Sequence, residues 1–152
     1  MSEHIATITW RREGSGFEPQ SYSRDHRWRF EGGIEVNGSA APAYRGNPAY
    51  VDPESAFVAS ISSCHMLTFL FLCARRKLVV NGYTDQATGH LERRPDGKLA
   101  MTRVELHPTI EFEGAPPSAE ELHRLHEQAH ADCFIASSVT TAITVTEEDR
   151  AP

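Results

Sequence analysis

Alternating apolar and polar positions near the N-terminus predict β-structure. Residues 4–10 alternate regularly, as the side chains of a strand do because neighbours point to opposite faces. Residues 27–30 and 34–36 repeat the pattern on either side of a Gly-Gly pair, which is typical of a tight hairpin. The next segment, residues 38–50, is rich in glycine, proline, alanine and asparagine and predicts an ordered loop.

A long uncharged stretch predicts the main helix. Residues 56–74 contain no charged side chain, and three basic residues follow directly. Asp52 can cap the free N–H groups of the first turn, Pro53 suits the first helical position, and Glu54 favours the positive end of the helix dipole. We therefore expect a helix from Pro53 to about Lys77. Because it is apolar nearly all round, we expect it to be buried at the centre of the fold.

The same stretch raises the question of a membrane. Its length is near the lower limit for a helix that spans a bilayer. Three serines, Cys64 and His65 gather in its middle, however, where polar groups cost most in a membrane. The strands predicted on both sides also need a helix to cover them. A buried core helix is therefore the better interpretation, and we expect no membrane partner.

The second half of the chain predicts a hairpin, a helix and a last strand. Residues 83–92 and 99–112 alternate and are joined by a Pro-Asp-Gly turn, which predicts a long antiparallel hairpin. Ser118, followed by two glutamates, is typical of a helix start. Residues 139–145 alternate again and predict a strand. Strands, a buried helix, strands, a helix and a strand indicate an α+β fold in one domain, residues 1–152.

Composition narrows the classes of function. The chain has 152 residues, of which 39% are hydrophobic and 24% charged, as in ordinary soluble proteins. Its net charge of −6 would repel phosphate backbones and anionic lipid, so we expect no nucleic-acid partner. The first ten residues lack the basic and apolar regions of a signal peptide. We therefore expect a cytoplasmic protein, whose thiols are kept reduced.

The positions of the three cysteines on the predicted helices indicate different roles for them. Cys64 and Cys73 lie on one helix, roughly 13 Å apart along its axis, which is too far for a disulfide. We expect Cys73 to be a core residue. Cys133 continues the apolar stripe of the second helix and should face the core, where the helix that carries Cys64 must lie. Two interpretations stay open: a pair of thiols that meet, or two unrelated buried cysteines. The apolar stripe consists of Leu122, Leu125 and Ala129.

The histidines give weaker indications. His65 adjoins Cys64 but projects about 100° away around the helix, so we expect a structural or interface role for it and not that of a base. The second helix carries three histidines on one face that could hold a metal, although no motif such as H-E-x-x-H accompanies them. Histidines at such spacing usually form a solvated flank, that is, a solvent-exposed side of the helix beside its apolar stripe. We therefore expect no metal. These three are His123, His126 and His130.

Two segments resemble the OsmC/Ohr family of osmotically inducible and organic hydroperoxide resistance proteins. They are residues 51–67, from Val-Asp-Pro-Glu to Cys64-His-Met-Leu, and residues 129–133, which end at Cys133. The spacing from the Pro-Glu pair to the first cysteine and the late second cysteine are fairly specific together. The resemblance runs from about residue 45 to residue 145. It implies an intertwined homodimer in which antiparallel sheets pack on long buried central helices.

The resemblance also implies a reaction, the reduction of organic hydroperoxides without a metal or an organic cofactor. Cys64 would be the thiolate that attacks the peroxide and becomes a sulfenic acid, and Cys133 would be the thiol that forms a disulfide with it. An external dithiol, of lipoyl type in relatives, would reduce that disulfide. Glu54 matches the glutamate that holds the family's activating arginine, and Arg45 is our choice for the arginine. The alternatives to it are Arg24, Arg27 and Arg29.

Other interpretations remain open from the sequence. A straight helix places Glu54 roughly 15 Å from Cys64, so either a partner subunit supplies the glutamate, or a bend or the length of the arginine closes the gap. A binding module that holds a small apolar ligand at the dimer interface is the alternative function. A metal-dependent hydrolase built on the histidines is a third. Aromatic and aliphatic neighbours of Cys64 favour organic hydroperoxides over hydrogen peroxide: Phe57, Leu67, Phe69 and Phe71.

Overall fold

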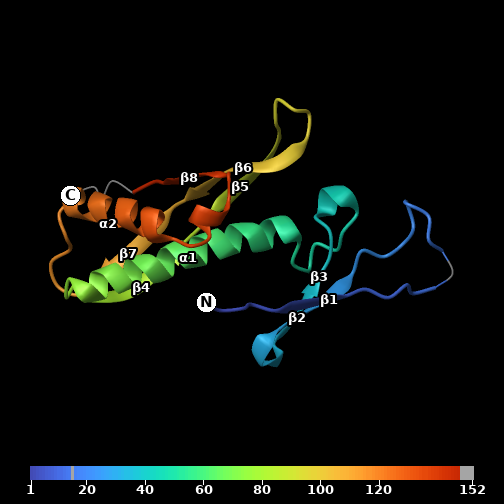
Figure 1. The fold of residues 1–152 in the computed structure, drawn as a ribbon, viewed down its shortest axis with the longest axis horizontal. Helices are drawn as coiled ribbons and strands as arrows, with labels where there is room; N and C mark the ends of the chain where they lie inside the picture. Colours follow the sequence, from blue (N-terminus) through green and yellow to red (C-terminus); the bar gives the residue numbers. More distant parts are fainter. Residues whose placement is uncertain (15, 148–152) are drawn as a thin grey trace. The chain divides into compact units, whose positions relative to one another are not determined.

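The computed structural model describes residues 1–14 and 16–147. The chain divides into two compact units, Met1–Ala56 and Phe57–Pro152. Strands, 3-10 turns and two α-helices alternate along the sequence, which confirms the predicted α+β class (Figure 1).

The first unit is built on an antiparallel sheet of three strands in the order β1-β2-β3. These strands are β1 (Ala6–Thr9), β2 (His26–Phe30) and β3 (Glu35–Gly38). The hairpin predicted between β2 and β3 is confirmed. Its turn depends on Gly32 and Gly33, which both have a φ of 83°, a backbone conformation that strains side chains with a Cβ.

A hydrogen-bonded cluster orders the loop that follows β3. Buried Ser39 donates its hydroxyl proton to Asp25 Oδ1 at 2.8 Å and accepts the backbone N–H of Asn47 at 3.0 Å. The loop contains one turn of 3-10 helix, Pro42–Tyr44. The ordered loop predicted from residues 38–50 is therefore confirmed, because the buried Ser39 hydroxyl satisfies a backbone N–H of the loop and is itself held by Asp25.

Helix α1 (Pro53–Arg75) begins where the sequence predicts. The Asp52 carboxylate accepts the backbone N–H of Ser55 at 2.9 Å and its hydroxyl at 2.8 Å, which caps the first turn. Among the described residues, α1 is the one helix long and apolar enough to cross a membrane by length and composition, and 28% of its apolar window is buried within this chain.

Within this chain, α1 is buried along one face and exposed along another. Leu67 and Phe71 are 63% and 60% exposed, because the helix packs against α2 and the sheets of the second unit along one face. The side chains on that face lie about one turn apart, as the helical repeat requires. They are Ile61, His65, Phe69, Leu72 and Cys73.

Five strands of the second unit form two sheets. The antiparallel pair consists of β4 (Val80–Asp85) and β7 (Pro108–Phe112). The three-stranded sheet has the order β5 (Thr88–Arg93), β6 (Leu99–Leu106) and β8 (Ala142–Val145). Strand β5 runs antiparallel to β6, whereas β8 runs parallel to it. The last strand was predicted, but its parallel direction was not.

The long hairpin predicted over residues 83–112 pairs correctly but divides between the two sheets. The division falls after Asp85 on one side and at His107 on the other, where Asp85 Oδ1 accepts the His107 backbone N–H at 2.7 Å. Beyond this corner, β5 and β6 continue to the predicted Pro-Asp-Gly turn, in which Gly97 has a φ of 83°. The alternation of apolar and polar residues does not show where the hairpin divides, because side chains alternate with a period of two along the strands of both sheets.

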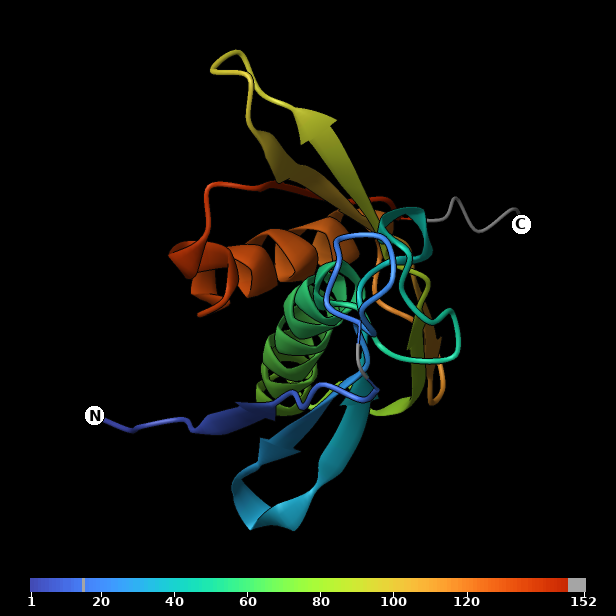
Figure 2. The same cartoon turned by 90° about the vertical axis from the view of Figure 1, so that its right-hand side faces the viewer.

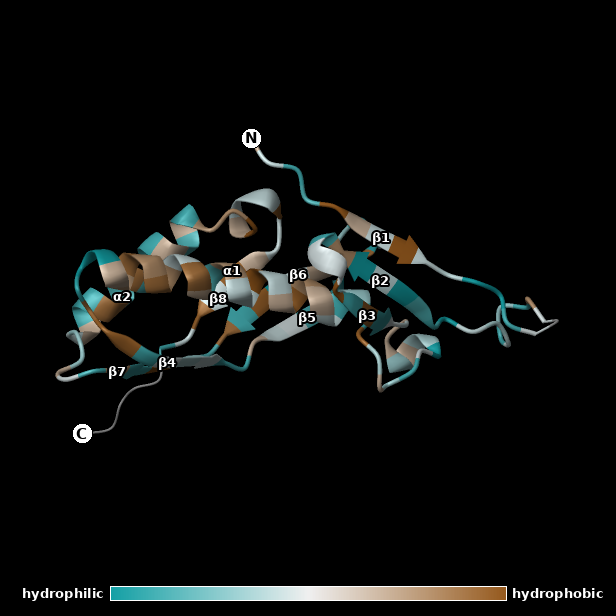
Figure 3. Ribbon diagram, turned by 90° about the horizontal axis from the view of Figure 1, so that it is seen from below, coloured by the Kyte–Doolittle hydropathy of each residue, from teal (hydrophilic) through white to brown (hydrophobic). Residues whose placement is uncertain are grey.

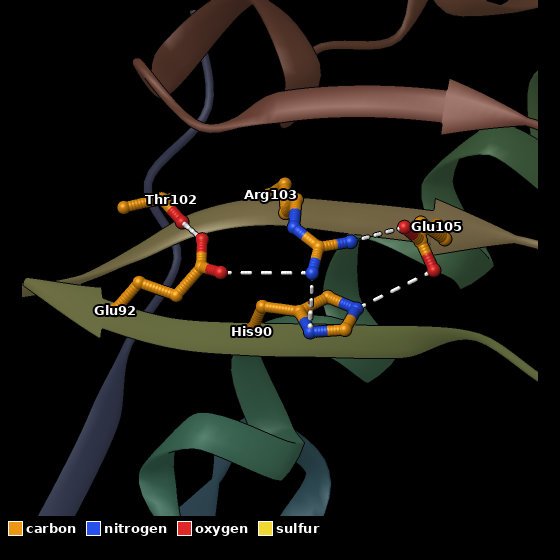
Figure 4. A network of polar contacts seen from close by, with 5 residues as sticks. All are labelled: His90, Glu92, Thr102, Arg103 and Glu105. Carbon is orange, nitrogen blue, oxygen red and sulfur yellow. Dashed lines mark hydrogen bonds and ion pairs between the residues drawn. The ribbon is translucent and has the colours of Figure 1, made fainter.

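The tip of the β5–β6 hairpin projects beyond the rest of its sheet, and polar side chains tie its strands together (Figures 2 and 4). Arg103 Nη2 lies 3.0 Å from His90 Nδ1, and its other terminal nitrogen pairs with Glu105. Since the guanidinium can only donate, His90 Nδ1 accepts and His90 Nε2 carries the proton that points to Glu105 Oε2 at 3.4 Å. Glu92 accepts from Arg103 and from Thr102 on the same face.

Helix α2 (Ala119–Asp132) begins at the predicted cap, where Ser118 Oγ accepts the Glu121 backbone N–H at 3.2 Å. It lies beside the C-terminal half of α1, and apolar bands follow both helices (Figures 1 and 3). Its stripe is confirmed, since Leu125 and Ala129 are fully buried. The core that joins the two helices and β7 contains Phe69, Leu72, Cys73, Ile110, Leu125 and Ala129.

A second core cluster lies under the three-stranded sheet. Ile61 of α1 packs there with Val104 and Leu106 of β6, and Val58 contacts the cluster from one turn earlier on the helix. Cys64 lies between Ile61 and Phe69, at the junction of the two clusters along α1. Its position is therefore set by packing on both sides.

Gly89 of β5 allows α1 to approach the sheet closely. A Cβ added there would lie 2.3 Å from Val58 Cγ2 and 2.5 Å from Met101 Cε. We expect Gly89→Ala to lower the free energy of unfolding by about 1–3 kcal/mol, measured by urea denaturation followed by circular dichroism. Gly82→Ala is the matched control, because its Cβ would meet only the flexible end of Glu111, 3.0 Å away. Equal stability of the two variants would contradict the close approach.

Candidate active site

The thiols of Cys64 and Cys133 meet inside the second unit. Cys64 lies half-buried on α1, and Cys133, 1% exposed, is the residue at which α2 ends. Burial raises the pKa of the Cys133 thiol, and a side-chain hydrogen bond to Cys64 raises it further. Both cysteines are free thiols. Of the two interpretations that the sequence left open, the structure supports thiols in contact.

The chain around Cys133 forms a tight turn that holds its sulfur. The Ala136 backbone N–H donates to Cys133 Sγ at 3.4 Å, and the Cys133 carbonyl accepts the backbone N–H and the hydroxyl of Ser137 at 3.0 and 3.1 Å. The N–H groups directed at the sulfur oppose the rise in its pKa, but burial and Cys64 outweigh them. Cys133 therefore carries its proton at neutral pH and can donate it towards the Cys64 sulfur.

Cys73 is separate from this pair. It is 1% exposed within the core between α1 and α2, and burial raises the pKa of its thiol to about 11. A thiol that keeps its proton is a poor nucleophile. The prediction that Cys73 is a core residue is confirmed.

A buried pair of histidines lies between α1 and α2, and one of the two is the residue after Cys64. His65 Nε2 is 3.0 Å from His126 Nδ1, and the two rings are parallel to within 8°. His126 also stacks on Phe69, with ring centroids 4.4 Å apart. His126 thus lies against two rings of α1 that are one helical turn apart. The expected structural role of His65 is supported by this contact.

The prediction that the histidines of α2 form a solvated flank is wrong for His126, which is 3% exposed. It comes four residues after Leu122 and therefore lies at the edge of the apolar stripe, a sign that was available in the sequence. His123 and His130 are exposed, and His123 Nδ1 lies 2.9 Å from Glu147 Oε1. Within residues 1–14 and 16–147, no three side chains of the metal-binding types gather into a site.

Burial keeps the two histidines neutral. It lowers the pKa of His65 to about 4, and the charge of His130 lowers it too, whereas Asp85 acts in the opposite direction. Burial likewise lowers the pKa of His126 to about 4, helped by His65. Buried His65 Nδ1 has no hydrogen-bond partner. A proton on His65 Nε2, donated to His126, leaves only a lone pair without a partner, which costs less than a buried N–H.

A partly buried contact anchors α1 two residues before Cys64. Ser62 donates its hydroxyl proton to Asp85 Oδ2, while Asp85 Oδ1 accepts the His107 backbone N–H. One carboxylate thus connects the helix to the corner where the two sheets divide. Nothing in the sequence pattern distinguishes Asp85 from an ordinary strand-end residue, because both of its partners are distant along the chain.

Glu54 has an unusual environment within the first unit. Its Oε2 atom is buried and has no hydrogen-bond partner. A buried carboxylate oxygen normally accepts a hydrogen bond, and an arginine is the donor best suited to it. The structure thus shows an acceptor at Glu54 that an additional cation would satisfy.

Sequence comparison places these residues in a known family. The profile of the family described as OsmC-like protein matches residues 46–148. The chain belongs to the OsmC-like family. No curated protein matches the sequence. The resemblance inferred from residues 51–67 and 129–133 is therefore confirmed.

Solved structures of OsmC-like proteins share the fold. An OsmC-like protein of unknown function from Vibrio cholerae is 42% identical, with a TM-score of 0.93 over 97% of this chain and 99% of that one. An organic hydroperoxide resistance protein from Elizabethkingia anophelis is 21% identical, with a TM-score of 0.72 over 97% and 98%. OhrB of Bacillus subtilis, also such a protein, is 14% identical, with a TM-score of 0.67 over 95% and 98%. At the last two levels of identity, the likeness shows the fold alone.

The arginines considered for the OsmC-like site differ in how many hydrogen bonds and ion pairs their guanidinium groups already make. Arg45 is exposed, has a φ of 65°, and reaches one carbonyl, Gln20 O, at 3.5 Å. Arg24 donates to the carbonyls of two neighbouring residues and lies over the ring of Tyr22. The other two arginines both pair with one glutamate on the sheet; they are Arg27 and Arg29, with Glu35. Arg45 therefore keeps the most donors for another acceptor.

The neutral histidine pair makes stability depend on pH. Because the folded-state pKa values lie below the value of about 6.5 of an unfolded histidine, the unfolded chain binds more protons below that pH, and stability falls as the pH falls towards 4. We expect a loss of about 1–2 kcal/mol for each ring between pH 7 and pH 5.

Urea denaturation at both pH values measures this loss. The double variant His65→Leu/His126→Leu should lose much less stability over the same pH range, because it lacks both buried rings. The matched control is His123→Leu, which removes an exposed histidine from the same helix. An equally steep pH dependence in the double variant would show that the buried rings do not cause it.

Proposed function

We propose that this OsmC-like protein is a thiol peroxidase that reduces organic hydroperoxides. The proposal is supported by the contact between the Cys64 and Cys133 thiols, in a family whose members include hydroperoxide resistance proteins. A buried thiol that meets a half-exposed one at the junction of two core clusters is the arrangement that a disulfide-forming cycle requires.

The first step is the oxidation of Cys64. Its thiolate attacks the terminal oxygen of the hydroperoxide, the O–O bond breaks, and the alkoxide leaves and takes a proton to become an alcohol. The terminal hydroxyl stays on Cys64 as a sulfenic acid. Cys133, which keeps its proton, donates a hydrogen bond towards the attacking sulfur before the reaction.

The second step forms the disulfide. The Cys133 sulfur loses its proton and attacks the Cys64 sulfur, and the hydroxyl of the sulfenic acid leaves with that proton as water. The backbone N–H of Ala136 stabilises negative charge on Cys133 as the proton departs. An external dithiol of lipoyl type then reduces the disulfide and becomes a disulfide itself. No metal or organic cofactor takes part.

Arg45 and Glu54 complete the proposed site. A guanidinium beside Cys64 would stabilise its thiolate, and the buried Glu54 Oε2 would accept an N–H of the same guanidinium. Arg45 is our choice because its donors are the least occupied.

We also propose that the protein is a cytoplasmic homodimer. The exposed Leu67 and Phe71 follow each other along the face of α1 that this chain leaves uncovered. Apolar side chains at that spacing suit a second helix.

A binding module is the alternative function. The first unit contains a cavity of about 380 Å³, within which the rings of Trp10, Phe17 and Tyr22 are in mutual contact. Such a cavity suits a small apolar ligand. A protein that binds such a ligand but leaves Cys64 reduced in the presence of a hydroperoxide would be a binder and not a peroxidase.

Replacement of each cysteine tests the peroxidase. Cys64→Ser should abolish consumption of tert-butyl hydroperoxide. Cys133→Ser should still form the sulfenic acid but progress to sulfinic acid, because the partner thiol is missing. Intact-mass and peptide mass spectrometry measure these products, with Cys73→Ser as the matched control that keeps the Cys64–Cys133 disulfide. Two free thiols in the treated wild-type protein would refute the proposal.

Replacement of the arginines tests the activation of Cys64. Arg45→Gln should slow sulfenic acid formation at pH 7 about tenfold or more, because a rise of one unit in the pKa of Cys64 lowers its thiolate fraction about tenfold. The rate of this variant should recover at higher pH, where the thiol ionises without the guanidinium. Arg45→Lys should retain part of the rate. Stopped-flow kinetics with Arg24→Gln as control make the measurement. A slow Arg24→Gln and a normal Arg45→Gln would assign the role to Arg24.

A further inference from the structure

His126 is connected to the position of each cysteine in the proposed reaction. On one side it contacts His65, the residue after Cys64; along its own helix it precedes Cys133 by seven residues. We propose that the clamp formed by His65, His126 and Phe69 positions α2 along α1 so that Cys133 meets Cys64. The proposed function gives the Cys64–Cys133 contact its catalytic purpose, and this inference rests on the proposed function in that respect only.

The geometry of the clamp restricts sliding of the two helices. His65 and Phe69 are one turn apart on α1, where one turn rises about 5.4 Å. The His126 ring lies face to face with Phe69, at a centroid separation of 4.4 Å and an interplanar angle of 20°, and meets the His65 ring edge to edge, with centroids 5.3 Å apart and planes parallel to within 8°. A shift of α2 along α1 by part of a turn would press His126 into one ring and separate it from the other. Close-packed interiors resist such a shift.

The hydrogen bond adds a directional constraint to the stacking. A bond of 3.0 Å between His65 Nε2 and His126 Nδ1 forms at one relative orientation of the rings. The buried core side chains that join the helices here are apolar, among them Leu125 and Ala129, and tolerate small shifts. The histidine pair is therefore a buried contact between these helices that favours one alignment.

A rigid segment connects the clamp to the second thiol. From His126 to Asp132, α2 is a continuous helix, and it ends at Cys133, roughly 10 Å further along its axis. Ala129, on the path, is fully buried. A displacement of His126 therefore moves Cys133 by a similar amount, while Cys64 stays in place because neighbouring Ser62 is bound to Asp85.

A buried polar pair is a costly way to gain stability alone. Both rings are removed from water, and His65 Nδ1 has no hydrogen-bond partner. Leucine or phenylalanine at the two positions would fill the space without that cost. The pair is consistent with selection for alignment of the helices, a property that packing by itself specifies less sharply.

The equilibrium between the two thiols and their disulfide measures this alignment without any peroxide. We would equilibrate the full-length protein in glutathione redox buffers, trap free thiols by alkylation, and count them by mass spectrometry. The ratio gives the effective concentration of Cys133 at Cys64. His65→Phe and His126→Phe, which keep an aromatic ring at each position but remove the hydrogen bond, should each lower it about tenfold. The double variant should be no worse than either single variant, since both act through one contact.

Three controls separate alignment from stability. Arg76→Ala removes the surface contact between the same helices, in which Arg76 lies 3.2 Å from Gln128 Oε1, and should leave the equilibrium unchanged. Ile143→Ala removes volume from the core cluster under the three-stranded sheet without pressing on α1, so it destabilises the second unit away from the clamp and should also leave the equilibrium unchanged. His65→Gln, whose amide can still donate to His126, should stay closer to wild type than His65→Phe and provides a milder substitution where the phenylalanine variants fold poorly.

The outcomes are distinct. Wild-type equilibria in His65→Phe and His126→Phe, or the same loss in Ile143→Ala, would overturn the positioning role and leave the peroxidase untouched. A wild-type protein that forms the disulfide in glutathione but consumes no hydroperoxide would refute the proposed function, and the effect of the histidine variants would still support the clamp. Absence of a disulfide in the wild-type protein at any buffer ratio would overturn both.

Discussion

The packing of α2 against α1 is the constraint on which the thiol pair depends. Cys64 and Cys133 are brought together because Leu125 and Ala129 bury one face of α2 against the helix that carries Cys64. The tight turn after Asp132 then holds the Cys133 sulfur at the helix end.

Polar groups buried beside Cys64 make this region of the core unusual. Ser62 bonds to Asp85 and His65 to His126, so two of the residues that flank the thiol are tied to different elements by hydrogen bonds. Hydrogen bonds of this kind contribute little net stability, but they favour one geometry over neighbouring ones. The same features would serve the proposed peroxidase cycle, in which Cys133 would have to reach the sulfenic acid before a second peroxide does.

Much of the fold could be predicted from local pattern. Alternation identified the strands, the Gly-Gly pair identified the first hairpin, and Asp52 and Ser118 identified the two helix starts. Helical spacing also showed that Cys133 faces the core. The site was only partly accessible in this way: the cysteines were recognised, whereas Asp85 was not, and His126 was expected in solvent.

The sequence by itself determined the kinds of element, the starts of the two helices and the inward direction of the second cysteine, because caps, turns and periodicity act between residues close along the chain. The tertiary structure decided which groups meet: Cys64 with Cys133, His65 with His126, and Asp85 with Ser62 and His107. It also decided that α1 is covered along one face only within this chain. These outcomes depend on how whole elements pack, and residues far apart in sequence have no local pattern that records their contact.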